Sequence, residues 1–384
     1  MRIYPMGKTM RQGSLSGRAV LVAMVVAFST GLIGSLAVRP AGGDIATTTA
    51  VDPASGAQRQ HIRWRMPVSF QSTMPVLGDN PIYVTERVRA LSGGAFELAI
   101  YEPGEIVPAF SITDAVRDRK VNVGYTWLGY DQGKIPASAL LGAVPFGMEP
   151  WEMAAWWFEA GGRELGQALY RKHGSHILMC GMTGPETAGW FREPIRSLAD
   201  LQGLKIRFAG LGGKVIEKAG ASVTMLPGGE IFQALEKGAI DATEFALPIV
   251  DQALGFNRIA SYNYYPGWHQ PATASHLVVN LESWGRLAAQ DKAILETACT
   301  AGIIRNLANS EATQGAVIAG FPDIGVSAET LPLEVLRELE RITAEVMREE
   351  ADKDEDFRLI LESQTAFRSE YAHWKSRAYL PRNF

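Results

Sequence analysis

The chain has 384 residues, 47% of them hydrophobic and 20% charged, and its formal net charge is −4 at pH 7. This length can supply two hydrophobic cores, and the slightly acidic balance argues against nucleic acid as a partner, because phosphate binding needs a basic face. Composition leaves the other function classes open, so the information on function lies in particular segments.

The N-terminal segment has the pattern of an export signal. Basic residues precede an apolar run at residues 19–38, which is long enough either for a signal sequence or for a bilayer span. We therefore expect residues 1–38 to be a signal peptide or a membrane anchor and residues 39–60 to be a flexible linker. The remaining chain would then be exported to the periplasm, either free or anchored to the inner membrane.

Strands and helices are predicted to alternate after residue 61. Residues 62–68 and 96–102 read as strands, and a helix from residue 79 to 91 separates them and ends at two glycines. A third strand is predicted at residues 121–127. This alternation predicts an α/β fold in which helical crossovers bring strands parallel.

The middle of the chain repeats this alternation more tightly. Between residues 204 and 245 the pattern is strand, helix, strand, helix, strand, with Gly220 and Gly238 at the expected helix ends. This predicts a βαβαβ unit that forms a domain inserted into the first one. Residues 276–280 then return to a buried strand, and the chain from residue 281 onward is almost entirely helical.

These patterns predict two lobes and a helical C-terminal region. The expected limits are 61–183 with 272–300 for the first domain, 184–271 for the second, and 301–384 for C-terminal helices that span both lobes. The last helix carries Phe367, Tyr371, Trp374 and Tyr379 at helical spacing. Such an aromatic face predicts either packing on its own chain or a subunit contact.

Cys180 and Cys299 are the only cysteines. Cys180 lies in a strand-like segment and Cys299 in a helical one, so burial as free apolar side chains is favoured, and a disulfide is the alternative.

The sequence lacks the common catalytic patterns HExxH and GxSxG. Gly212-Gly213-Lys214 is followed by Val215 instead of the Ser or Thr of a phosphate loop, so we interpret this segment as a glycine-rich turn. An enzyme that uses Glu244 as a general base remains an alternative.

Three features could form a ligand cleft. Arg192 follows two aromatic residues, Glu244 ends the last βαβαβ strand, where α/β sheets place ligands, and residues 262–272 are rich in aromatic rings. Each also has a structural explanation: a salt bridge for Arg192, a helix cap for Glu244, and packing between domains for the aromatic segment. His269 reads as an orienting or surface residue rather than a metal ligand.

Together these motifs resemble a known family. The segments GWFREPIRSLADLQGLKIRF, PGGEIFQALEKGAIDATEF and YNYYPGWHQ resemble the solute-binding proteins of tripartite ATP-independent periplasmic (TRAP) transporters, and they are most similar to the branch that binds 2-oxo acids and lactate. The resemblance runs from about Trp64 to Tyr371. It implies a two-lobed periplasmic binding protein that closes around a small carboxylate.

The resemblance also implies roles for individual residues. It implies that Arg192 grips a ligand carboxylate and that Glu186, Glu244, the Phe245 carbonyl and Gln270 hold a cation. In the branch pattern, Gln is usual where this chain has Glu186, Glu is usual at Gln270, and Trp is usual at Phe245. Asn is common in place of Met182, which puts the identity of the ligand in doubt.

Electrostatics agrees with a cation at such a site. An arginine fork can give a carboxylate two charge-assisted hydrogen bonds, whereas two glutamates in the same cleft would repel that ligand. A cation bound by oxygen atoms removes this repulsion, and oxygen ligands favour Na⁺, Ca²⁺ or Mg²⁺ over zinc. We expect Na⁺ or Ca²⁺.

Aromatic rings would supply the cleft walls, with core packing as the alternative. The expected rings are those of Trp127, Tyr130, Trp190, Phe245 and Trp268, and Tyr130 could also donate a hydrogen bond to a keto or hydroxyl oxygen.

The function expected from the resemblance is capture of pyruvate or lactate with a cation, without chemistry on the ligand. The partners would be TRAP membrane subunits and a second copy of the chain in a homodimer. A membrane-anchored sensor of the same fold is the other alternative.

Overall fold

The computed structural model describes residues 61–380. Strands and helices alternate through most of this segment, so the predicted α/β fold is confirmed. The expected signal or anchor at residues 1–38 and the expected linker at residues 39–60 lie outside the described residues. Within the described part, no helix combines the length and the hydrophobicity that a bilayer span requires.

The first sheet region is built from the first four strands and from one strand that comes later in the chain. Strand β1 (Ile62–Pro67) pairs in parallel with β2 (Phe96–Tyr101) after helix α2 (Asp79–Leu91). A bridge between Val68 and Tyr125 connects this pair to a second sheet. In that sheet β10 (Thr273–Asn280) lies between β3 (Val123–Trp127) and β4 (Ser175–Thr183), antiparallel to both.

The other large sheet contains the predicted βαβαβ unit. Its order is β11-β9-β5-β8-β6-β7, and β6 is parallel to both β7 and β8, which confirms that unit. The strands are β5 (Gly189–Phe191), β6 (Lys205–Arg207), β7 (Ser222–Thr224), β8 (Ala242–Thr243), β9 (Tyr262–Tyr265) and β11 (Ser327–Thr330). The connecting helices are α7 (Gly210–Lys218) and α8 (Gly228–Glu236).

Two details of this sheet differ from the sequence prediction. The glycine-rich segment at residues 210–213 is not a turn but the first turn of α7. Strand β11 lies in the region that was expected to be almost all helix, and it pairs in parallel with β9 at the sheet edge. The domain limits drawn from the sequence stay a prediction.

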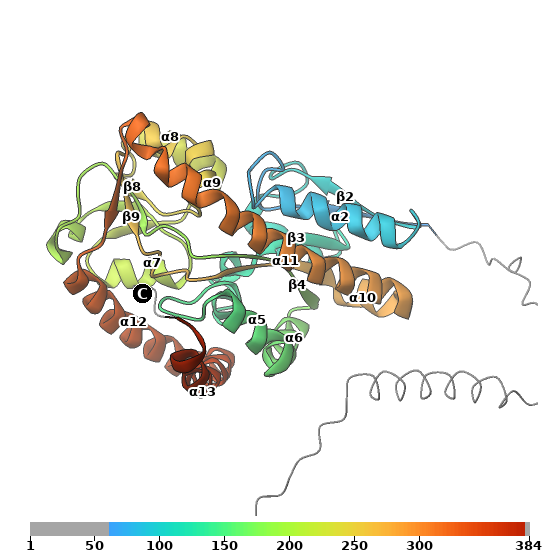
Figure 1. Ribbon diagram of the computed structural model, residues 1–384. Coiled ribbons are helices and arrows are strands. Elements are labelled where there is room, and N and C mark those ends of the chain that lie inside the picture. Colours follow the sequence, from blue (N-terminus) through green and yellow to red (C-terminus); the bar gives the residue numbers. More distant parts are fainter. Residues whose placement is uncertain (1–60, 381–384) are drawn as a thin grey trace, which may run out of the picture. The chain divides into compact units, whose positions relative to one another are not determined.

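The chain passes between the two large sheets at residues 184–188 and 266–272. The first segment joins β4 to β5, and the second joins β9 to β10. Helix α11 (Ala289–Ala319) runs beside both regions, because it packs on β4 and α2 and also contacts α9 (Pro248–Ala253) (Figure 1). Side chains on these two segments are therefore placed between the sheets.

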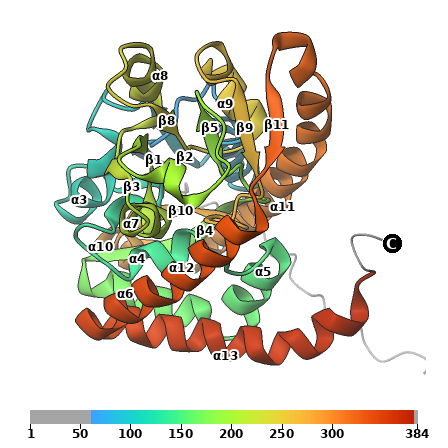
Figure 2. The same ribbon diagram turned by 90° about the vertical axis from the view of Figure 1, so that its left-hand side faces the viewer.

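The remaining helices cover the sheets and form the C-terminal region. Helices α12 and α13 pack against each other, and α13 runs past α6, α4 and α5 (Figure 2). The α-helices are α3 (Ile112–Arg117), α4 (Ser138–Gly142), α5 (Pro150–Glu159), α6 (Gly162–Lys172), α10 (Leu281–Arg286), α12 (Leu333–Lys353) and α13 (Glu355–Ala378). The 3₁₀-helices are η1 (Ala109–Ser111), η2 (Leu128–Asp131), η3 (Leu198–Leu201), η4 (Phe256–Arg258) and η5 (Phe321–Ile324).

The aromatic face of α13 is partly packed and partly exposed. The rings of Phe367 and Tyr371 stack with their centroids 5.6 Å apart, and Phe367 packs on the core of its own chain. Trp374, by contrast, is 61% exposed. Packing on the chain's own core therefore accounts for only part of this face.

The prediction of free cysteines is wrong. A disulfide joins Cys180 of β4 to Cys299 of α11, and both residues are buried. They are 119 residues apart in the sequence, and they meet because α11 packs directly on β4. The burial of both cysteines was predicted correctly, but the contact between α11 and β4 was not predicted.

Candidate functional site

A small cavity between the two large sheets gathers most of the predicted site residues. Its volume is about 20 Å³, close to the room that one water needs. The residues that line it are Phe70, Leu77, Trp127, Tyr130, Glu186, Arg207, Ala209, Glu244, Phe245, Gln270, Thr273 and Ser275. Larger cavities exist, among them one of about 530 Å³ between α6 and α11. The ionisable groups of that larger cavity are mostly exposed, whereas those of the small cavity are buried, which marks the small one as the functional candidate.

Arg207 lines this cavity and is only 1% exposed. It ends strand β6, which pairs with β8 so that Arg207 is opposite Thr243, next to Glu244. Its Nη1 donates to Oε2 of Glu244 at 2.9 Å and to the Glu244 carbonyl at 2.7 Å, and its Nε donates to the Leu226 carbonyl at 3.1 Å. These bonds fix the guanidinium plane.

Glu244 is held in its ionised form. Burial raises the pKa of this carboxyl, but the charge of Arg207, hydrogen bonding with His269 and the N–H of Ala209 outweigh burial and lower the pKa overall. The Ala209 N–H donates to Oε2 at 3.2 Å and belongs to the N-cap residue of α7, so Glu244 also accepts at the start of a helix. Glu244 therefore also caps a helix, which was the structural explanation considered for it.

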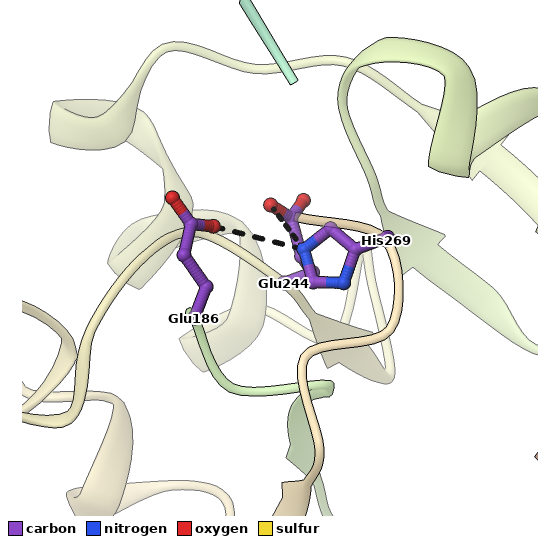
Figure 3. A group of neighbouring side chains, drawn as sticks. All are labelled: Glu186, Glu244 and His269. Carbon is purple, nitrogen blue, oxygen red and sulfur yellow. Dashed lines mark ion pairs between the residues drawn. The ribbon is translucent and has the colours of Figure 1, made fainter. Parts of the chain in front are cut away.

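The ring of His269 faces both glutamates with the same nitrogen (Figure 3). Its Nε2 is 3.2 Å from Oε1 of Glu244 and 3.6 Å from Oε2 of Glu186. Burial opposes protonation of the ring, but the proximity and the negative charges of both glutamates raise the pKa of His269 to about 9. Burial is also the main reason that the pKa of Glu186 is raised. With His269 protonated, two cations balance two carboxylates, which makes their burial tolerable.

Close contact between residues 184–188 and residues 266–272 brings Glu186 into this cluster. The Glu186 N–H donates to the Gln270 carbonyl at 3.2 Å. Gly267 lies directly against the Glu186 backbone, and a Cβ at this position would collide with the Glu186 carbonyl. A glycine in the PGW segment is therefore required for this approach.

The cluster has more acceptor oxygens than donors. Thr273 Oγ1 is 2.8 Å from Oε1 of Glu186 and 2.7 Å from Oε1 of Gln270, but a hydroxyl has a single proton to donate. Oε2 of Glu186 is buried without a hydrogen bond. Ligand atoms of Glu186, Glu244 and His269 lie within 4.8 Å of one another. Such a buried, oxygen-rich group fits a cation that prefers oxygen ligands, such as Na⁺ or Ca²⁺.

Six of the predicted site residues line this cavity, and three do not. Glu186, Glu244, Gln270, Phe245, Trp127 and Tyr130 come together there. Arg192 is not brought into this cavity: its Nη2 donates to the Leu235 carbonyl, and it is not a lining residue. The physical reason is that β5 ends at Phe191, so the next side chain turns toward the end of α8.

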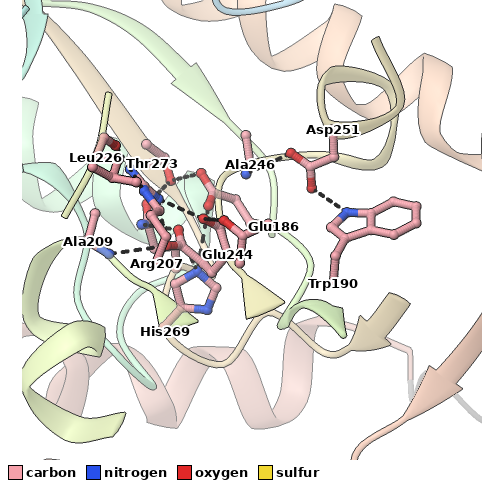
Figure 4. A network of polar contacts seen from close by, with 12 residues as sticks. Glu186, Trp190, Arg207, Ala209, Leu226, Glu244, Ala246, Asp251, His269 and Thr273 are labelled. Atoms are coloured by element: carbon pink, nitrogen blue, oxygen red, sulfur yellow. Dashed lines mark hydrogen bonds and ion pairs between the residues drawn. The ribbon is translucent and has the colours of Figure 1, made fainter. Parts of the chain in front are cut away.

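Trp190 and Trp268 are not brought into the cavity lining either. Trp190 is fully buried in the core of the six-stranded sheet, and its indole N–H donates to Oδ2 of Asp251 at 2.9 Å (Figure 4). Trp268 lines a separate groove of about 400 Å³ with Phe146. Both rings pack beside the cluster and not inside the cavity.

The sequence reading missed Arg207, Thr273 and the burial of His269. Arg207 could have been found by the rule that was applied to Glu244, because both residues lie at or just after the carboxyl ends of adjacent parallel strands. The sequence carries no comparable signal for Thr273, which is buried and whose hydroxyl bridges Glu186 and Gln270.

Comparison with known families gives one match over most of the chain. The sequence pattern of the DctP family, described as "Bacterial extracellular solute-binding protein, family 7", matches residues 77–354. A monocarboxylate 2-oxoacid-binding periplasmic protein of Nostoc sp. is 35% identical over 315 residues, which cover 82% of this chain and 86% of that protein.

Solved structures with similar folds include three TRAP transporter solute-binding proteins. One from Bordetella bronchiseptica is a mixed-occupancy dimer with calcium and picolinate, 32% identical over 83% of this chain and 95% of that one, with a TM-score of 0.81. One from Pseudoalteromonas atlantica has bound sodium and pyruvate, at 31% identity, 83% and 97% coverage and a TM-score of 0.80. One from Colwellia psychrerythraea has bound calcium and pyruvate, at 30% identity, 83% and 98% coverage and a TM-score of 0.80.

Proposed function

We propose that this chain, which belongs to the bacterial extracellular solute-binding proteins of TRAP transporters (family 7), captures a small monocarboxylate together with a cation. The observation that carries the proposal is the buried cluster of Arg207, Glu244 and Glu186 in a cavity between the two large sheets. The ligand class we propose is that of 2-oxo acids such as pyruvate, with lactate as a related candidate, because the similar proteins named above bind such compounds.

Arg207, rather than Arg192, is the residue we assign to the ligand carboxylate. Its Nη1 and Nε are held by Glu244 and the Leu226 carbonyl, while Nη2 donates to no carbonyl or carboxylate oxygen within residues 61–380. A guanidinium that is fixed on one side and has donors left on the other is preorganised for a carboxylate.

The cation site we propose consists of Glu186, Glu244, Gln270 and the Phe245 carbonyl. Na⁺ or Ca²⁺ bound there would supply the positive charge that keeps the two carboxylates from repelling an anionic ligand. Thr273 would orient Glu186 and Gln270, because its hydroxyl lies between their side-chain oxygens.

The cavity walls favour a short ligand. Trp127, Tyr130 and Phe245 surround the space with rings, and Trp127 and Tyr130 pack edge to face with centroids 5.1 Å apart. Burial, as the main cause, raises the pKa of Tyr130 to about 12, so its hydroxyl keeps its proton and can donate to a keto or hydroxyl oxygen. A cavity of about 20 Å³ admits such a ligand only when the lobes separate and close again.

The protein would bind its ligand without transforming it. Glu244, the residue that an enzymatic alternative would use as a base, has its pKa lowered and both oxygens engaged by Arg207, Ala209 and His269. A general base works best with a pKa near the working pH, so this environment favours binding over catalysis. We therefore propose delivery of the ligand to TRAP membrane subunits from the periplasm. The alternative is a membrane-anchored sensor, which would be favoured if the mature protein kept residues 1–38.

A homodimer is also part of the proposal. The exposed rings of Trp374 and Tyr379, 61% and 49% exposed, lie at the end of α13, where apolar surface favours a partner. A dimer formed by the Bordetella protein supports this proposal.

Titration calorimetry with pyruvate and lactate tests the proposal. Each ligand is measured in Ca²⁺, in Na⁺, and in N-methylglucamine buffer with a chelator. We expect binding only when one of the two inorganic cations is present. Equal affinity in all three buffers would contradict the cation, and no binding in any of them would contradict the ligand class. A change in the ligand's NMR spectrum during incubation would instead favour an enzyme.

A further inference from the structure

Asp251 has a fully buried carboxyl group next to the cavity but not in its lining, and burial, as the main cause, raises the pKa of this carboxyl well above its ordinary value. It lies in α9, and its two oxygens have separate partners: Oδ1 accepts from the Ala246 N–H at 3.1 Å, and Oδ2 accepts from the Trp190 indole N–H at 2.9 Å (Figure 4). Because each oxygen is engaged, the orientation of the carboxylate is fixed.

The Ala246 N–H belongs to the same peptide group as the Phe245 carbonyl. In a trans peptide these two groups point in opposite directions, and this peptide is not among the cis bonds of the described chain. Both neighbouring peptides are also held, because Nη1 of Arg207 donates to the Glu244 carbonyl at 2.7 Å and the Thr187 N–H donates to the Ala246 carbonyl at 3.1 Å. Asp251 therefore sets the direction of the Phe245 carbonyl.

The Phe245 carbonyl oxygen accepts no hydrogen bond from any residue between 61 and 380. The ring of the same residue lines the cavity beside Glu244. A backbone acceptor that is held from behind and left without a donor in front has the arrangement of a cation ligand.

We propose that Asp251 is a positioning residue for the cation: by holding the Ala246 N–H, it aims the Phe245 carbonyl at the cation site and strengthens that carbonyl as a ligand. This inference rests on the proposed function, since it requires a cation at that carbonyl. A cation on the oxygen and an acceptor on the N–H of one peptide group polarise it in the same direction, so each interaction strengthens the other. Trp190 contributes by keeping the carboxylate in place.

A purely structural role for Asp251 makes a different prediction. Asp251 lies in the first turn of α9 and reaches back to the residue before the N-cap, so it also stabilises the start of that helix. Loss of a helix cap lowers stability and leaves cation binding unchanged. Loss of the group that aims the Phe245 carbonyl also weakens cation binding.

Calorimetry with ligand-free protein separates the two roles. Asp251→Ala removes the acceptor for the Ala246 N–H, whereas Asp251→Asn keeps an oxygen acceptor there. We expect Asp251→Ala to weaken the binding of both cations about tenfold and Asp251→Asn to weaken it much less, because the carboxyl group acts by holding one N–H. Val250→Ala is the matched control: Val250 is buried in the same helix, so this variant should lose stability and keep both cation affinities. No loss in Asp251→Ala, an equal loss in Asp251→Asn, or the same loss in Val250→Ala would overturn the inference.

A measurement on the unsubstituted protein does not depend on how the variants fold. In protein labelled with ¹⁵N-alanine, Ca²⁺ should shift the Ala246 amide proton downfield as its bond to Asp251 strengthens. An unchanged Ala246 resonance during a titration that calorimetry shows to be complete would overturn the inference and leave the cation site intact. Failure of the unsubstituted protein to bind either cation would instead contradict the proposed function itself.

Discussion

Nε2 of His269 lies 3.2 Å from Oε1 of Glu244, and both side chains are fully buried. The same nitrogen is 3.6 Å from Oε2 of Glu186. The imidazole is therefore placed where its proton can offset the two carboxylates, the task that the proposed cation would also perform. Proton and cation should consequently affect stability in related ways.

Stability should fall with rising pH when no cation is bound. Burial lowers the pKa of His269, but Glu186 and Glu244 raise it to about 9, above the ordinary value of 6.5. A raised pKa stabilises the fold fully below pH 6.5 and loses this contribution as the pH rises through 9. In N-methylglucamine buffer with a chelator, Tm should therefore decrease over this range. The charged groups near His269 are the two glutamates and Arg207, which is bonded to Glu244.

His269→Gln is the control for this pH dependence, since glutamine does not titrate. Its Tm should be lower at pH 6.5 and nearly level up to pH 9. A slope as steep in this variant as in the unsubstituted protein would assign the pH dependence to other groups.

Arg207 and Arg192 should respond differently to substitution by lysine. Lysine cannot reproduce the fixed fork of Arg207, and weakening one partner of a buried charge pair costs about 2–5 kcal/mol, so pyruvate affinity should fall at least about thirtyfold. Arg192→Lys should change affinity less than about threefold, because Arg192 bonds to the Leu235 carbonyl outside the cavity. Calorimetry measures both, and circular dichroism checks the fold. The reverse ranking would restore the prediction made from the sequence.

Gly267→Ala should destabilise the fold and weaken cation binding together. The added Cβ would collide with the Glu186 carbonyl, so the segment that carries Glu186 must move. We expect a loss of about 1–3 kcal/mol in the free energy of unfolding, measured in urea. Gly285→Ala is the matched control: no atom lies within 4 Å of its added Cβ, and alanine favours the helix by roughly 0.5–1 kcal/mol. Unchanged cation affinity in Gly267→Ala would show that the contact between Gly267 and the Glu186 carbonyl does not support the cation site.

The disulfide should contribute to stability. Cys180 and Cys299 close a loop of 119 residues, and removal of a native disulfide costs about 2–5 kcal/mol. Cys180→Ala/Cys299→Ala should therefore unfold at a lower urea concentration, and a reductant should lower the midpoint of the unsubstituted protein toward that of the variant. Insensitivity of the unsubstituted protein to reductant would contradict the pairing.

The elements that are most visible in the sequence are those with a regular side-chain pattern. The helix from Asp79 to Leu91 and the strand-helix repeats between residues 204 and 245 were predicted correctly, because burial of one face leaves a periodic trace. Strand β11 was missed because its four residues pair at a sheet edge and alternate between partly buried and exposed, which is too short a pattern to recognise.

Only part of the site was predicted, because some of its residues follow from sequence motifs and others depend on the direction of side chains in the folded chain. Glu186, Glu244 and Gln270 were found from motifs, and the structure does bring them together. The choice between Arg192 and Arg207 depends on the direction of single side chains at the ends of three-residue strands, which local sequence does not encode. The disulfide depends on the packing of α11 on β4, a contact between segments that are far apart in the chain.

The six-stranded sheet is completed by β11, which follows its neighbour β9 by more than sixty residues. During synthesis, the six-stranded sheet cannot be completed until residues 327–330 have emerged from the ribosome. The other sheet likewise waits for β10, its central strand. Such late, non-local pairing slows folding, and slow folding keeps a nascent polypeptide threadable through a translocation pore.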